Sequence, residues 1–178
     1  MALSKIKASS VDLTDNYAFT GTITGAGGIT EADLWRVTVD EGGDQSPLTN
    51  WERADSDSQG YIGTGMSHSS GTFTFPSTGI WLVNFIVTIN NGSATDGLVA
   101  LYIKATTNGS SYGNASVNYE HVQSGHYSSG STSLLFDCTN TSTHKVQFHI
   151  ENALVSTTID GHSTQNETHA TFVRLGDT

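Results

Sequence analysis

GTFTFPSTGIWLVNFIVTINN, residues 71–91, is the stretch that decides the fold. It reads as a short strand, a Pro-Ser-Thr-Gly turn and a long second strand. In the second strand every odd position from Trp81 to Ile89 is apolar, which is the period of two expected for a buried sheet face. The even positions are more than half apolar as well. A strand that is apolar on both faces lies in the middle of a sandwich or against another subunit.

The even-numbered face of this strand is therefore a candidate oligomer interface. Its apolar side chains belong to Ile80, Leu82 and Ile86. In a later segment, Leu134, Phe136 and Cys138 share one phase, so Leu135 points the other way and joins the candidates. We predict a sandwich that buries one sheet face in an oligomer.

Composition and charge limit the class of protein. The chain has 178 residues, enough for one domain with a core. It is 35% hydrophobic, only 13% charged and has 19 glycines, which favours strands and turns over helices. The formal net charge of −10 argues against nucleic acid or an anionic membrane as a ligand, because phosphate binding needs clustered Lys and Arg. No segment approaches the ~18 apolar residues of a membrane span, so we expect no membrane insertion.

Cellular context is read from the N-terminus and the one cysteine. MALSKIKASS has no apolar run after it, so we expect no secretion signal and synthesis in a cytoplasm. Cys138 excludes an internal disulfide, and its apolar phase predicts a core thiol.

We divide the chain into an extended anchor or linker at 1–28, a connecting segment at 29–50 and a β-domain at 51–178. The anchor ends in a glycine-rich hinge and is either a floppy terminus or a peptide that docks on a larger partner. Docking would use four large apolar side chains, those of Val11, Leu13, Tyr17 and Phe19. In the connecting segment, 29–39 is expected to begin with a helical turn after Thr30 and to end as a strand.

Turn signals recur about every 8–12 residues along the β-domain, the spacing of a sandwich. Further strands are expected at 98–103, 116–122, 133–138, 145–151 and 168–175. The loops expected to make outward contacts are 90–97, 108–113, 124–131 and 156–167.

The hairpin FTFPSTGIWLVNFIVTI resembles the Pro-x-x-Gly hairpin of C1q/TNF-like jelly rolls, with Phe75, Pro76, Gly79, Trp81 and Val83 at the matching places. SSGSTSLLFDCTNTSTHKVQFHIEN and THATFVRLG are similar to later strands of that family. The resemblance covers 51–176. It departs at Trp81 and Val83, where aromatics are usual, and at Thr143-His144, where the family tends to have Gly-Asp. It implies an all-β, ten-strand jelly-roll β-sandwich that assembles as a tight homotrimer.

The N-terminal MALSKIKASSVDLTDNYAFTGTITG is similar to the leaders of bacteriophage tail-fibre, spike and other virion proteins. This second resemblance implies a trimeric head displayed on the virion surface, joined to other virion proteins through residues 1–28. Two roles follow from it: adsorption to a glycan or protein of the host surface, or decoration of the capsid. The short chain without shaft repeats suits direct docking on a particle.

Two motifs suggest chemistry, and each has a simpler interpretation. Asp55-x-Asp57-x-Gln59-Gly60 imitates the first half of a calcium loop, but Met66 stands where the bidentate acid belongs, so an acidic turn is favoured. Residues 109–113, GSSYG, match the nucleophile-elbow pattern, which requires a strand-to-helix turn, whereas the flanks here indicate a hairpin. We expect no catalytic residues.

The histidines and the N-x-[ST] sequons complete the candidates. No H-x-H pair occurs among the seven histidines, so most are expected on the surface, and no metal or cofactor is expected within one chain. In a trimer, one histidine near the axis becomes three, enough for a metal or an anion; the sequence does not indicate which histidine. The five sequons, which begin at Asn91, Asn108, Asn114, Asn140 and Asn166, reflect Asn, Ser and Thr in turns.

Two other classes compete with a virion protein. An enzyme acting on surface polysaccharide needs paired carboxylates, and the acids of the C-terminal two-thirds are dispersed. A cellular C1q-like binding module is disfavoured because no collagen-like run is present.

Overall fold

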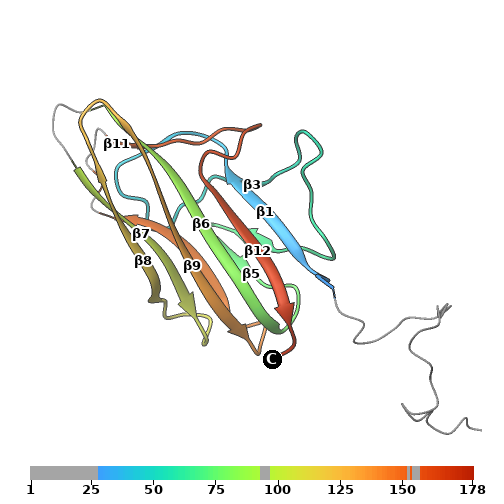
Figure 1. The fold of residues 1–178 in the computed structure, drawn as a ribbon. Helices are drawn as coiled ribbons and strands as arrows, with labels where there is room; N and C mark the ends of the chain where they lie inside the picture. Colours follow the sequence, from blue (N-terminus) through green and yellow to red (C-terminus); the bar gives the residue numbers. More distant parts are fainter. Residues whose placement is uncertain (1–27, 93–96, 152, 154–156) are drawn as a thin grey trace, which may run out of the picture.

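The chain forms an all-β sandwich of two facing sheets (Figure 1). The computed structural model describes residues 28–92, 97–151, 153 and 157–178. Within these residues every regular element is a strand, numbered β1 to β12. No helix occurs among them, and so none is long and apolar enough to cross a membrane. The predicted fold class is confirmed.

Sheet A has seven strands and sheet B has five. Sheet A contains β1 (Ala32–Val37), β2 (Glu41–Gly42), β3 (Trp51–Arg53), β6 (Gly79–Asn91), β9 (Tyr127–Cys138), β11 (Thr157–Ile159) and β12 (His169–Gly176). Sheet B contains β4 (Ser67–Ser69), β5 (Thr72–Thr74), β7 (Gly97–Thr106), β8 (Gly113–Val122) and β10 (Lys145–Glu151).

β6 is the central strand of sheet A. On one side it pairs with β9 along almost its whole length, from Gly79 opposite Cys138 to Asn90 opposite Tyr127. On the other side it pairs first with β12 and then with β11. β12 in turn lies between β6 and β1 (Figure 1). The strand that was expected to organise the fold therefore does so.

The core lies between the sheets and is rich in aromatic rings. The odd positions of β6, from Trp81 to Ile89, are fully buried. The ring of Phe85 lies 4.7 Å from that of Phe148 on sheet B, and Phe148 lies 5.4 Å from Phe73. Such ring contacts add to the stabilisation from burial alone. Cys138 is buried as predicted, and this burial raises the pKa of its thiol.

Three expectations about local structure were wrong. Segment 29–50 is not a connection, because β1 and β2 are strands of sheet A. No helical turn follows Thr30; strand β1 begins at Ala32. Residues 124–131 are not all turn, because β9 begins at Tyr127 and its Ser/Gly-rich start pairs with the end of β6. The Ser/Gly-rich start of β9 carries no apolar period of its own and is held in the sheet by its pairing with β6.

Candidate interaction face

The outer face of sheet A presents apolar side chains from three adjacent strands. Leu82 of β6 lies directly between Leu135 of β9 and Val173 of β12, so the three side chains share this face. Leu135 is 64% exposed, and Leu175, which follows on β12, is also exposed. Large apolar side chains grouped on one face of a sheet mark a site of contact with another molecule.

The structure places all four predicted interface residues on this one face. Ile80, Leu82 and Ile86 are half-buried within the single chain, and their partners on β9 are Asp137, Leu135 and Ser131. The face is therefore apolar toward the start of β6 and more polar toward its end. We name it the A face. The four anchor candidates, Val11, Leu13, Tyr17 and Phe19, lie outside the described residues.

The A face meets a second exposed surface along β9. β9 is an edge strand of sheet A and β8 is an edge strand of sheet B, and each has one strand partner. A hydrogen bond of 2.6 Å between the hydroxyls of Ser116 and Thr132 links them across the sandwich. At this edge, Val117 and Tyr119 of β8 are exposed, and Tyr127 of β9 is exposed in the same phase as Leu135, on the A face.

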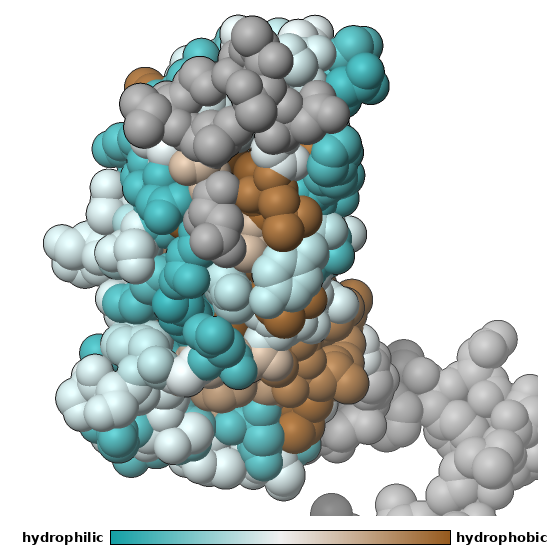
Figure 2. Space-filling view, turned by 90° about the vertical axis from the view of Figure 1, so that its left-hand side faces the viewer, coloured by the Kyte–Doolittle hydropathy of each residue, from teal (hydrophilic) through white to brown (hydrophobic). Residues whose placement is uncertain are grey.

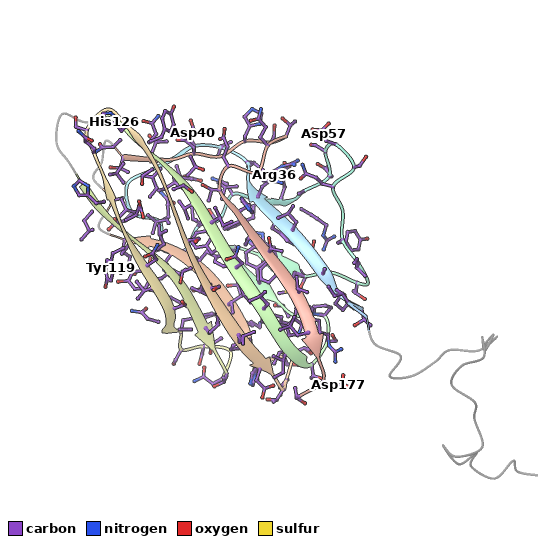
Figure 3. All side chains as sticks on the ribbon, in the orientation of Figure 1. Arg36, Asp40, Asp57, Tyr119, His126 and Asp177 are labelled. Atoms are coloured by element: carbon purple, nitrogen blue, oxygen red, sulfur yellow. The ribbon has the colours of Figure 1, made fainter. Side chains whose placement is uncertain are left out.

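Figure 2 views the molecule from the β7 and β8 side and shows brown, apolar surface in the middle of this view and, more extensively, low and toward one side. Figure 3 shows Tyr119 at the outer margin of β8, and the turn carrying His126 at the upper end of the same edge. β9 thus forms the corner between the A face and this edge, which we call the β8–β9 edge.

The calcium-like motif contributes Asp55 to an ion-pair network around Arg36. Arg36, fully buried, donates from Nε to Glu52 Oε1 and from Nη2 to Asp55 Oδ1, both at 2.8 Å. Figure 3 shows Arg36 pointing toward the loop that carries Asp57. Asp55 is therefore paired with a guanidinium in this loop. No group of three or more possible metal ligands occurs within the described part of the chain.

The GSSYG motif lies at the turn between β7 and β8, and β8 begins at its Gly113. The flanking elements are two strands, so the helix that a nucleophile elbow requires is not there. The loop is organised by Asn108, whose Oδ1 accepts hydrogen bonds from the backbone N–H groups of Ser110 and Ser111 at 2.9 Å. This is a turn stabilised by an asparagine side chain.

The histidines do not cluster, and not all of them are on the surface. His149 on β10 is only 6% exposed, and burial together with the charge of Lys104 lowers its pKa to about 4. Its Nδ1 lies 2.9 Å from the hydroxyl of Ser46, and its Nε2 lies 3.1 Å from Gln147 Oε1. Gln147 Oε1 can only accept, so Nε2 carries the proton and Nδ1 accepts from Ser46. Sequence reasoning missed this buried contact because Ser46 lies outside every expected strand.

One carboxylate has a strongly raised pKa. Burial, and then the charges of Asp40 and Glu167, raise the pKa of Asp160 from 3.8 to about 6. Asp160 follows β11, and the N–H of the next residue, Gly161, donates to Asp40 Oδ1 at 3.0 Å. Repulsion among these carboxylates destabilises the fold locally.

The chain matches no protein-family model and no curated protein sequence. It is similar in structure to murine APRIL, with a TM-score of 0.59 at 15% identity, covering 82% of this chain and 99% of that one. A second structure, Eiger TNF from S. frugiperda, has a TM-score of 0.57 at 12% identity and covers 83% of this chain and 93% of that one. At such identities the likeness shows the fold, which is a TNF-like jelly roll.

Proposed function

We propose that this chain is the trimeric head of a bacteriophage virion protein and that it contacts the host surface. The observation that carries the proposal is the A face, on which Leu135 is 64% exposed to solvent in a single copy, beside Leu82 and Val173. Burial of such side chains in an oligomer is favourable by ~25 cal/mol per Å² of apolar area. The TNF-like fold supports a head of this kind, and the resemblance of residues 1–25 to virion leaders supports its location.

A closed ring of three copies uses two different surfaces of each copy. We infer that the A face of one copy receives the β8–β9 edge of the next. The two surfaces meet at β9, so β9 lines the threefold axis. Leu135 and Tyr127, the most exposed large apolar side chains in the described part of the chain, both lie on this strand. The exposure of these two side chains in a single chain is explained if each lies against the neighbouring copies in the trimer.

Sedimentation of the full chain at micromolar concentration tests the trimer. We expect a trimer for the wild type and a monomer for Leu135→Asp, because a charge at the axis would lack a partner. Ile62→Asp is the matched control: Ile62 is 49% exposed and lies beside β1, on the side of sheet A opposite β9. A wild-type monomer, or loss of the trimer in the control alone, refutes the arrangement.

Antibody labelling of intact virions tests the location. Serum raised against residues 51–178 is expected to label particles in electron micrographs. Label on the tail supports adsorption, and the isolated head should then compete with virions for host cells. Label over the capsid supports the alternative role as a decoration protein. Particles without any label would rule out both roles.

A further inference from the structure

The turn between β8 and β9 holds an exposed histidine in a fixed position. His126 N donates to Gln123 O at 3.2 Å, and its carbonyl accepts from Asn91 N at 3.1 Å. Gly125 N donates to Asn91 O at 2.7 Å. Asn91 itself is fully buried and donates from Nδ2 to Val122 O. The turn that carries His126 is therefore tied to the end of β6 by backbone hydrogen bonds.

The ring of His126 has the hydrogen bond that is typical of histidines that bind metals. Its Nδ1 lies 2.8 Å from the carbonyl oxygen of Ser124. A carbonyl oxygen only accepts, so Nδ1 carries the proton and Nε2 keeps its lone pair. Histidines that bind metals commonly donate their other N–H to a backbone carbonyl, which fixes the tautomer and the ring orientation.

Three other histidines, His144, His149 and His162, lack this combination. Both ring nitrogens of His144 contact threonine hydroxyls, and both of His149 are engaged as described above. His162 is the instructive contrast, because its Nδ1 accepts from Thr164 N at 3.1 Å. The proton of His162 is therefore on Nε2, and no free lone pair points outward.

We propose that three copies of His126 bind one Zn²⁺ on the axis of the trimer. The inference rests on the proposed trimer, in which β9 lines the axis and the turn at its start lies at one end of that axis. Three imidazole nitrogens at about 2.0–2.1 Å leave the fourth tetrahedral position for water or an anion. Three neighbouring chains, each with a formal net charge of −10, favour a cation at such a site.

The experiment titrates Zn²⁺ into the full chain, prepared without a histidine tag and stripped of metal with EDTA. Calorimetry gives the stoichiometry, and sedimentation of the same samples gives the oligomeric state. We expect one Zn²⁺ per three chains and an increase in the melting temperature on binding. His126→Ala should lose saturable binding and remain a trimer, and His162→Ala should bind like the wild type.

Two different failures are distinguishable. A wild-type trimer without saturable Zn²⁺ binding, or binding that survives in His126→Ala, overturns the zinc site and leaves the trimer intact. A wild-type monomer overturns the trimer and the site with it. A ratio of one ion per chain also overturns the proposal, because a single His126 cannot hold Zn²⁺ alone.

Discussion

Replacing Asp160 with asparagine tests the cost of a partly buried carboxylate beside other acids. The pKa of Asp160 is raised from 3.8 to about 6, so the folded state holds its proton more tightly than the unfolded state does. The group therefore destabilises the fold above pH 6, and this cost disappears as the pH falls below about 4. The pKa difference corresponds to at most about 3 kcal/mol. Solvent screening at this incompletely buried site reduces the expected value to roughly 1–2 kcal/mol.

Urea denaturation at pH 8 and pH 5, at one protein concentration, measures the effect. We expect Asp160→Asn to be more stable than the wild type by ~1–2 kcal/mol at pH 8, and by roughly half as much at pH 5. Asp57→Asn is the control, because Asp57 is exposed and its φ of 51° suits asparagine. Its effect should stay within ~0.5 kcal/mol at both pH values. An equal gain for Asp160→Asn at both pH values would refute the electrostatic origin.

Three further predictions concern packing and the buried groups. Arg36→Ala should cost ~1–3 kcal/mol and make the loop 54–60 sensitive to protease, because the fully buried side chain that packs there and pairs with Glu52 and Asp55 is removed. Unchanged proteolysis would contradict this. Gly161→Ala should lower the free energy of unfolding in urea by ~1–3 kcal/mol, because a Cβ there would lie 2.3 Å from Val39 O. Gly113→Ala is the control and should be neutral, because a Cβ there would have open space around it. Ellman's reagent should react with the buried Cys138 only as fast as the protein unfolds; rapid labelling of folded protein would show that the thiol is accessible.

Sequence reasoning succeeded where one strand carries its own apolar period. The alternation of β6 and that of Lys145–Glu151 can be read directly from the residues, since burial follows side-chain period. β1 was missed as a strand of the sandwich because its pattern is interrupted by Asp33 and Arg36, both buried. Asp33 is satisfied by Arg53 and by the N–H of Met66, which lie 20 and 33 residues away in sequence. A local sequence pattern cannot predict hydrogen-bond partners that are so far apart in the sequence.

The candidate face was only partly predictable for a similar reason. The outward phase of Ile80, Leu82 and Ile86 follows from the period of β6 alone. That Leu135 lies opposite Leu82 depends on the register between β9 and β6, which spans more than fifty residues and is fixed by tertiary packing. The hydrogen bond that orients His126 depends on a three-residue turn conformation, which composition does not specify.

The position of β12 between β1 and β6 has a consequence for biosynthesis. The strand pairing of sheet A cannot be completed until β12, the last strand described, has left the ribosome. β1 and β6, which β12 joins, emerge much earlier. Pairing between segments so distant in sequence makes folding slow and leaves apolar strands exposed in the nascent chain. The A face, which includes β12, is therefore completed last, after the other strands of sheet A have been synthesised.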